Sequence, residues 1–370
     1  MKKLFDAISI GNIDLKNRIV RSATFERGLA DNEGRISDEF VEAYAALAGG
    51  GTAMIISGLM AVDENGRIYP HMVKAYGVDF VSGLGRLARV VHNNGSKLMV
   101  QLNHGGVKAL PTEKDSQVMG PSPITFIPDN PAQGMSKDDI KEVAGAFALA
   151  AARCQEAGAD GVQIHGAHGY LLSEFLSPFF NKRQDEYGGD IKGRSRFILE
   201  VLAAIRQEVG ADYPVWVKIN CQDFAGDQSF TFDECIQVCR ALAAEGLSAV
   251  ELSGGVGSMQ GNRPSRFVGS EKDEGLYARE ALQLADALDI PVLSVGGFRT
   301  PKVMEEWLNK GNIKALSLSR PLIREPALVR RWQSGDTGKA TCISCNKCFE
   351  VTKYGCWLDQ QQAAKMRAKK

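Results

Sequence analysis

Eight short runs of apolar, β-prone residues alternate with longer stretches of helical periodicity along nearly the whole chain. This alternation is typical of parallel strands that are joined by helices. Most of the runs are almost continuously apolar, as expected for strands that are covered on both faces. The predicted strands are 18–23, 53–59, 97–103, 161–165, 215–220, 249–253, 291–295 and 315–319. The predicted helices include 38–48, 80–93, 137–157, 194–209, 232–245, 278–288 and 301–310.

The pattern predicts an α/β fold and, within that class, a (β/α)8 TIM barrel. A doubly wound open sheet is the main alternative, and it requires a glycine-rich nucleotide-binding turn after an early strand. The first predicted strand ends instead in Arg21-Ser22-Ala23-Thr24. The third helix is preceded by Ser136 and has Asp139 in its first turn, a spacing that resembles a capping box.

Two predicted loops are too long for simple connections. Residues 105–136 follow the third strand and residues 166–193 follow the fourth. Loops longer than about 15 residues are usually functional lids or binding segments. Because both follow strand C-termini, we expect both at the same mouth of the barrel. Residues 4–15, with Gly11-Asn12 at their centre, predict a β-hairpin lid that closes the opposite end.

Charge and composition narrow the class of partner. The chain has 44 basic and 44 acidic side chains and 44% hydrophobic residues, which fits a globular enzyme with a large core and gives no basic surface for nucleic acid. No apolar stretch reaches the roughly 18 residues of a membrane span, and Asp6 lies where a signal peptide is apolar. We therefore expect a cytoplasmic protein that acts on a small molecule, binds neither nucleic acid nor membrane, and can form a homo-oligomer. The expected domains are a barrel at 1–335 and a cysteine-rich tail at 336–370.

Two histidines and a tyrosine, His165, His168 and Tyr170, directly follow the fourth predicted strand. The C-terminal ends of barrel strands carry the active site in this fold, so the position makes these residues catalytic candidates. Metal binding is an alternative because neighbouring imidazoles make good ligands, but no carboxylate or third histidine stands at metal spacing. If the two histidines have a structural role instead, backbone groups of the loop would form the hydrogen bonds of each imidazole.

The ends of the last two strands predict a phosphate site. Gly296-Gly297 ends strand seven and Arg320 follows strand eight. Loops at these two places commonly bind phosphate in TIM barrels, because glycine lets backbone amides approach the anion and arginine binds it bidentately. The alternative is a tight turn beside a surface ion pair.

Two polar side chains interrupt apolar strands. Gln101 closes strand three and points an amide into the mouth, or it is an ordinary hydrogen-bonded residue at a strand end. Lys218 lies inside strand five. Burying an ammonium without a partner is costly, so Lys218 needs an anion, an electron-rich ring or an internal salt bridge with a residue such as Glu251.

Together these motifs resemble the old yellow enzyme family of flavin-dependent oxidoreductases, over residues 3–335. The motifs are Asn17-Arg18-Ile19-Val20 with Ser22-Ala23-Thr24, Gln101-Leu102-Asn103-His104-Gly105-Gly106, His165-Gly166-Ala167-His168-Gly169-Tyr170 with Asp185-Glu186-Tyr187-Gly188-Gly189, and Gly296-Gly297 with Ser319-Arg320-Pro321-Leu322. The resemblance implies FMN across the barrel mouth. The cofactor-binding residues that it implies are Ser22, Ala23, Thr24, Gly58, Gln101, Lys218, Gly296, Gly297, Ser319 and Arg320.

The resemblance also implies roles for these residues. Gln101 binds the pyrimidine edge of the flavin, Lys218 places a cation beside N1 and the C2 carbonyl, and Arg320 helps to hold the phosphate. The implied reaction is ping-pong: NADH or NADPH reduces the flavin at N5, and the reduced flavin passes hydride to the β-carbon of an α,β-unsaturated carbonyl compound. His165 and His168 then bind the substrate carbonyl, and Tyr170 protonates the α-carbon.

One position departs from the family pattern. Members with well-defined ene-reductase activity often carry Thr or Cys just after the first strand, where this chain has Phe25. Because that residue tunes the flavin, the departure bears on redox potential and on choice of substrate.

Four cysteines, Cys342, Cys345, Cys348 and Cys356, are grouped near the C-terminus. Closely spaced thiolates can bind an iron–sulfur cluster or zinc. Similar cysteines in the larger, 2,4-dienoyl-CoA-reductase-like branch of the family hold a four-iron cluster, so the resemblance implies [4Fe-4S] here. Zinc is the alternative metal, and free or disulfide-bonded thiols are the third possibility.

Two other functions are compatible with the barrel. A phosphate-binding isomerase or aldolase would share the site at strands seven and eight and could use Lys218 as a Schiff-base lysine. A flavin-binding protein without turnover would keep the cofactor site alone.

Overall fold

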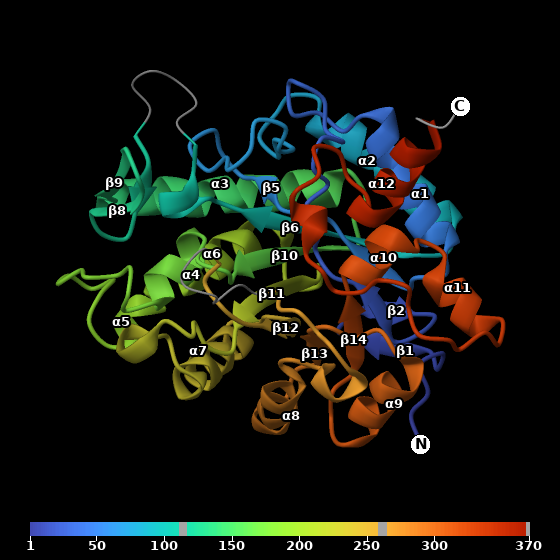
Figure 1. Cartoon of the computed structure of the whole chain (residues 1–370). Coiled ribbons are helices and arrows are strands. Elements are labelled where there is room, and N and C mark those ends of the chain that lie inside the picture. Colours follow the sequence, from blue (N-terminus) through green and yellow to red (C-terminus); the bar gives the residue numbers. More distant parts are fainter. Residues whose placement is uncertain (111–116, 258–264, 368–370) are drawn as a thin grey trace.

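The computed structural model describes residues 1–110, 117–257 and 265–367, and within them the eight predicted strands form a closed parallel barrel surrounded by helices (Figure 1). The barrel closes because β14 pairs with β3 and β10 pairs with β6. Its strands are β3 (Ile19–Arg21), β4 (Met54–Ile56), β6 (Lys97–Asn103), β10 (Gly161–Gly166), β11 (Val215–Asn220), β12 (Ala249–Ser253), β13 (Val292–Val295) and β14 (Ala315–Leu318). A short strand, β5 (Met60–Ala61), also pairs with β6. The predicted TIM barrel is confirmed.

The helices lie close to their predicted ranges. They are α1 (Asp38–Gly49), α2 (Phe80–Asn93), α3 (Lys137–Glu156), α6 (Arg196–Val209), α7 (Phe232–Ala244), α8 (Ala278–Ala287) and α9 (Pro301–Asn309). Two short helices that were not predicted, α10 (Arg320–Arg324) and α11 (Leu328–Gln333), follow the last strand. The predicted capping box at α3 is present, with Ser136 and Asp139 exchanging side chain to backbone hydrogen bonds.

One predicted helix differs from the structure. In place of 194–209, a short helix α5 (Ile191–Arg194) comes first and α6 follows after Ser195. The Asp190 side chain caps α5 by accepting from the Gly193 N–H at 3.0 Å. The buried Arg194 guanidinium then pairs with Glu234 and donates to the Leu176 carbonyl, which fixes α5 against the loop after β10.

The predicted hairpin closes the N-terminal end of the barrel. Strands β1 (Ile8–Ile10) and β2 (Ile13–Leu15) pair antiparallel. Ile10 and Ile13 belong to the same buried apolar cluster as Met54 and Trp216 from the barrel strands. Apolar side chains from the hairpin and the barrel strands therefore fill this end of the barrel.

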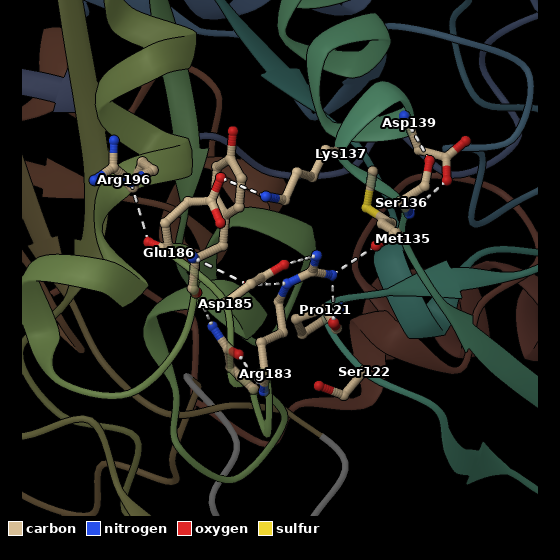
Figure 2. A network of polar contacts seen from close by, with 12 residues as sticks. Pro121, Ser122, Met135, Ser136, Lys137, Asp139, Arg183, Asp185, Glu186 and Arg196 are labelled. Carbon is tan, nitrogen blue, oxygen red and sulfur yellow. Dashed lines mark hydrogen bonds and ion pairs between the residues drawn. The ribbon is translucent and has the colours of Figure 1, made fainter.

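The two long loops form a joint structure beside the open end. The first contains a small sheet of β7 (Met119–Gly120), β8 (Ile124–Ile127) and β9 (Asn130–Gly134), and the second contains α4 (Leu171–Leu176) and α5. Figure 2 shows how Arg183 joins them: its guanidinium donates to the carbonyls of Pro121 at 3.0 Å and Met135 at 2.6 Å, and it pairs with Asp185 at 2.6 Å. Residues 111–116 of the predicted first loop lie outside the described part.

The C-terminal segment folds back over the barrel. It contains a 3-10 turn, η4 (Lys347–Phe349), and the helix α12 (Trp357–Arg367), which lies beside α1 and α10 in Figure 1. Lys353 pairs with Glu39 of α1 at 2.7 Å, and Asp359 pairs with Arg324 of α10 at 3.0 Å. Among the described helices, none combines the length and the apolar character that crossing a bilayer requires.

Candidate active site

A cavity of about 510 Å³ opens at the C-terminal ends of the strands. This volume lies within the range of small-molecule and cofactor sites. The predicted site residues that line it are Ser22, Ala23, Thr24, Gln101, His165, His168, Tyr170, Lys218, Gly296, Gly297, Ser319 and Arg320. Gly58 is not among the lining residues; its N–H donates to the buried Glu26 carboxylate at 3.0 Å. The fold therefore gathers all but one of the predicted barrel-site residues around one space.

His165, His168 and Tyr170 form one aromatic group on the cavity wall. The ring centroid of His165 lies 5.2 Å from that of His168 and 5.0 Å from that of Tyr170. His168 has a left-handed backbone with φ of 65°, and its N–H donates to Asn220 Oδ1 at 3.1 Å. Its Nε2 lies 2.7 Å from Ser253 Oγ. Tight backbone anchoring in this conformation turns the His168 ring toward His165.

Burial keeps both imidazoles neutral. It lowers the pKa of His165 well below its ordinary value, and the nearby charges of His168, Lys218 and Lys108 add to the effect. The pKa of His168 is lowered well below its ordinary value by the same burial and by Lys218 and Lys108. The Nδ1 atom of His165 is buried and has no hydrogen-bond partner among the described residues. Because this Nδ1 atom has almost no accessible surface, the other ring nitrogen, Nε2, is the His165 atom that a ligand carbonyl or hydroxyl could reach.

Lys108 is a cavity residue that the sequence did not reveal. Its ammonium donates to the carbonyls of His168 at 2.8 Å and Val256 at 2.7 Å and lies 5.1 Å from the centroid of the Tyr170 ring. Burial lowers the pKa of Lys108 to about 8, against the opposing charges of Glu174 and Asp223. Lys108 ends a short 3-10 turn, η1 (Gly106–Lys108), inside the first long loop, and a turn this short has no periodicity that could point to it in the sequence.

Lys218 satisfies its charge with a salt bridge. Its ammonium lies 3.0 Å from Glu251 Oε2 and donates to Ser22 Oγ at 2.7 Å, and both charged side chains are buried. Burial acts to raise the pKa of Glu251, but the Lys218 charge and a hydrogen bond from Gln163 outweigh it, so the pKa is lower than usual and the carboxylate is ionised. The internal partner that the sequence left open is thus present, while Lys218 also lines the cavity.

The predicted phosphate end combines glycine turns with an arginine. Gly296 and Gly297 have φ of 147° and 74°, and a Cβ on Gly297 would come within 2.5 Å of Val268 Cγ2, so glycine is required there. Arg320 donates to the carbonyls of Ser344 and Arg266 at 3.1 Å each. These hydrogen bonds anchor the guanidinium both to the C-terminal segment and to the loop after β12 that carries Arg266.

Aromatic side chains from distant segments complete the wall. Phe25 stacks on Tyr69, with ring centroids 4.3 Å apart and planes 17° from parallel. Tyr354 of the tail also lines the cavity, and its hydroxyl accepts from the buried Arg21 guanidinium at 3.2 Å. Phe25 therefore lies at the site, where the sequence placed it.

The four tail cysteines surround a second, much smaller cavity of about 20 Å³. Within the described ranges, no three His, Cys, Asp or Glu side chains are arranged so that they could hold a metal ion. Burial raises the pKa of Cys342, and it raises the pKa of Cys348 to about 11. Both thiols are therefore protonated at neutral pH until a metal displaces their protons.

Comparison with known proteins gives a family and relatives. Residues 3–338 match the model of the NADH:flavin oxidoreductase / NADH oxidase family. The chain is 35% identical over 350 residues to the metal reductase of Desulforamulus reducens, covering 94% of this chain and 51% of that protein. It is 32% identical over 332 residues to the NADPH dehydrogenase of Clostridium acetobutylicum, covering 88% of this chain and 93% of that protein.

Solved structures agree with this relationship. The complex of 2-naphthoyl-CoA reductase with 2-naphthoyl-CoA matches with a TM-score of 0.88 at 26% identity, covering 96% of this chain and 56% of that chain. The chain thus spans about half the length of the metal reductase and of this reductase.

Proposed function

Because the chain belongs to the NADH:flavin oxidoreductase / NADH oxidase family, as its resemblance to old yellow enzymes predicted, we propose that it binds FMN in the barrel-mouth cavity and uses NAD(P)H to reduce the activated C=C bond of α,β-unsaturated carbonyl compounds. One observation carries the proposal. The neutral imidazoles of His165 and His168 and the phenol of Tyr170 line the same cavity as Lys218 and Arg320.

The residues around the cavity fit FMN. Ser22, Ala23 and Thr24 supply a wall for the ring, and Gln101 supplies an amide for its pyrimidine edge. Gly296, Gly297, Ser319 and Arg320 supply backbone and guanidinium donors for the phosphate. Gly58 supports the site only from behind, through its hydrogen bond to Glu26. When bound, FMN supplies the hydride chemistry, and the protein supplies binding and orientation.

His165 and His168 hold the substrate carbonyl in this proposal. Neutral imidazoles donate a ring N–H to the oxygen without being consumed as acids, and their position fixes the alkene over the ring. Tyr170 gives its hydroxyl proton to the α-carbon. Burial, together with the nearby Tyr69, raises the pKa of Tyr170, so the phenol is fully protonated at neutral pH and available as the acid.

The test is the colour of the purified protein. We expect the visible absorption of bound flavin, and bleaching of that absorption by NADH or NADPH without oxygen, followed by recovery when an enone is added. Yellow protein that neither nicotinamide bleaches would indicate a flavin-binding protein without turnover. Colourless protein that takes up no FMN would reject the proposal and leave the isomerase or aldolase chemistry of Lys218.

We propose further that Cys342, Cys345, Cys348 and Cys356 bind a metal centre, either [4Fe-4S] or zinc. The support is that all four line one cavity, although their sulfur atoms must move together to hold a metal. The test is analysis of iron, sulfide and zinc in wild-type protein purified without oxygen. The control variant Cys154→Ser should have the same metal content as the wild type, because that buried thiol lies elsewhere in the core. Protein free of all three would reject this proposal.

A further inference from the structure

A chain of four buried polar side chains crosses the barrel interior below the cavity. Gln101 Nε2 donates to Gln163 Oε1 at 2.8 Å, and Gln163 Nε2 donates to Glu251 Oε2 at 2.9 Å. The same Glu251 oxygen lies 3.0 Å from the Lys218 ammonium. All four side chains are at most 2% exposed. Of these four side chains, only the first and the last, Gln101 and Lys218, line the cavity.

Strand register brings these side chains together. Gln101 of β6 pairs with Gln163 of β10, and Lys218 of β11 pairs with Glu251 of β12. Residues paired across neighbouring parallel strands project to the same face of the sheet, which here is the barrel interior. The network therefore belongs to the rigid part of the fold, and neither Gln163 nor Glu251 depends on a loop for its position.

The ionised Glu251 determines which amide group donates and which accepts in each hydrogen bond of this network. A carboxylate only accepts hydrogen bonds, so Gln163 must turn its NH2 group to Glu251 and its carbonyl to Gln101. Gln101 must then give an N–H to Gln163, which leaves its carbonyl oxygen as an acceptor for the cavity. The charge on Glu251 thus determines which end of the Gln101 amide a ligand meets.

Glu251 also compensates the cation at the cavity wall. Lys218 alone would present a full positive charge to a bound ligand, whereas the Lys218–Glu251 pair is neutral overall. An uncompensated charge at such a buried place acts strongly, because the surroundings screen it poorly. Compensation therefore weakens the attraction for a ligand that gains negative charge.

We propose that Glu251 is a positioning residue that sets both the charge and the hydrogen-bond polarity of the cofactor site from behind its wall. This inference rests on the proposed FMN site. By neutralising Lys218, Glu251 limits how much more tightly the site holds reduced, anionic FMN than oxidised FMN. It thereby lowers the reduction potential that Lys218 alone would set. Through Gln163, it also fixes Gln101 as the acceptor for the ring N–H of the pyrimidine edge.

The experiment measures the affinity of the apoprotein for oxidised and for reduced FMN without oxygen. In Glu251→Gln, Lys218 loses its counter-charge, and we expect the ratio of reduced to oxidised affinity to rise at least tenfold. That rise corresponds to a positive shift of about 30 mV in a two-electron potential. An unchanged ratio in this variant would overturn the inference.

A double variant, Lys218→Met with Glu251→Gln, keeps the site neutral and also covers the case in which Glu251→Gln does not fold. We expect its affinity ratio to stay close to that of the wild type, because the variant removes both charges of a pair that is neutral overall. If Lys218 acted as an uncompensated cation, the double variant would instead lose reduced-state preference at least tenfold, which would overturn the inference.

Gln163→Leu is the matched control, because it breaks the link to Gln101 and leaves the ion pair in place. We expect weaker binding of both forms of FMN by a similar factor, with the ratio kept. Wild-type apoprotein that binds neither form of FMN would reject the proposed function itself. Wild-type apoprotein that binds FMN, together with an unchanged ratio in Glu251→Gln, would reject only the inference about Glu251.

Discussion

Single residues at the cavity are held by burial in the protonation states that the proposed reaction requires. The pKa of each imidazole is lowered well below its usual value by burial, and the pKa of Tyr170 is raised by burial and by Tyr69. A neutral donor pair beside a protonated phenol suits binding of a carbonyl and protonation of the neighbouring carbon.

Tyr170→Phe should separate the two half-reactions. The variant keeps the ring that packs on His165 but loses the proton, so NAD(P)H should reduce the flavin at the wild-type rate while enone reduction slows by about 10²-fold or more. Stopped-flow spectroscopy of each half-reaction measures this. Tyr213→Phe is the matched control, since Tyr213 is not among the residues that line the cavity and its hydroxyl donates to the Ala159 carbonyl at 3.0 Å, and it should slow neither step. Unchanged enone reduction in Tyr170→Phe would remove Tyr170 from the acid role.

Replacement of both histidines by asparagine should reduce acid sensitivity. Folding lowers the pKa of both rings. Below about pH 6.5 the unfolded chain therefore binds protons at these two histidines that the folded chain does not bind. The free energy of unfolding decreases as the pH falls through this range. Each ring contributes a slope of about 1.4 kcal/mol per pH unit until its folded pKa is reached. Denaturant unfolding between about pH 8 and pH 5 measures the slope.

In the double variant, His165→Asn with His168→Asn, the acid loss of stability should be smaller than in the wild type. His71→Asn changes a half-buried imidazole that is not among the residues lining the cavity; it serves as the control and should keep the acid dependence of the wild type. Identical slopes for the wild type and the double variant would contradict the burial of the two rings.

At the scale of helices and strands, the pattern of apolar residues predicted the elements whose positions follow from local periodicity. All eight barrel strands could be predicted, because each is buried on both faces and reads as an apolar run. The break at Ser195 could not, because it depends on Arg194 reaching Leu176 and Glu234, which are remote in sequence. The small sheet of β7, β8 and β9 was also missed, because prolines mask its strand pattern.

Arg183→Met should loosen the two loops without opening the barrel. The variant loses two hydrogen bonds to backbone carbonyls of the first loop and the ion pair with Asp185. Hydrogen exchange should rise in 117–135 and 177–190 and stay unchanged in β10 and β11. The matched control is Lys137→Met, which removes the exposed Lys137–Glu186 pair seen in Figure 2 and should change stability by less than about 1 kcal/mol. Equal exchange in Arg183→Met and the wild type would show that the loops do not depend on this contact.

At the scale of the whole molecule, the site is assembled from segments that the sequence separates widely. The motifs predicted the residues on strand ends, because their positions follow from the barrel. Lys108, Tyr69 and Tyr354 could not be predicted, because the loops and the tail that carry them are placed by tertiary contacts. A salt bridge between Lys218 and Glu251 was one of the alternatives that the sequence left open. The part played by Gln163 could not be predicted, because it depends on the register of β6 and β10.

Tyr354→Ala tests whether the tail is part of the cofactor site. Tyr354 lines the cavity, its N–H donates to the Arg27 carbonyl at 2.7 Å, and its hydroxyl accepts from Arg21. Loss of the ring opens one wall, and we expect FMN affinity to fall about tenfold, or about 1.4 kcal/mol. Lys353→Ala removes only an ion pair that is more than half exposed on both sides, and should leave the affinity unchanged. Equal affinities of the two variants would place the tail outside the site.

The pairing of β3 with β14 has a consequence for synthesis of the protein. Ile19 leaves the ribosome 297 residues before its partner Leu316 (316 minus 19). Until then the nascent sheet has two open edges, which are templates for association with other chains. Late closure of this kind makes folding slow and exposes the growing polypeptide to aggregation. The yield of folded protein in a cell should therefore depend on the supply of chaperones, even though the core of the folded protein is well buried.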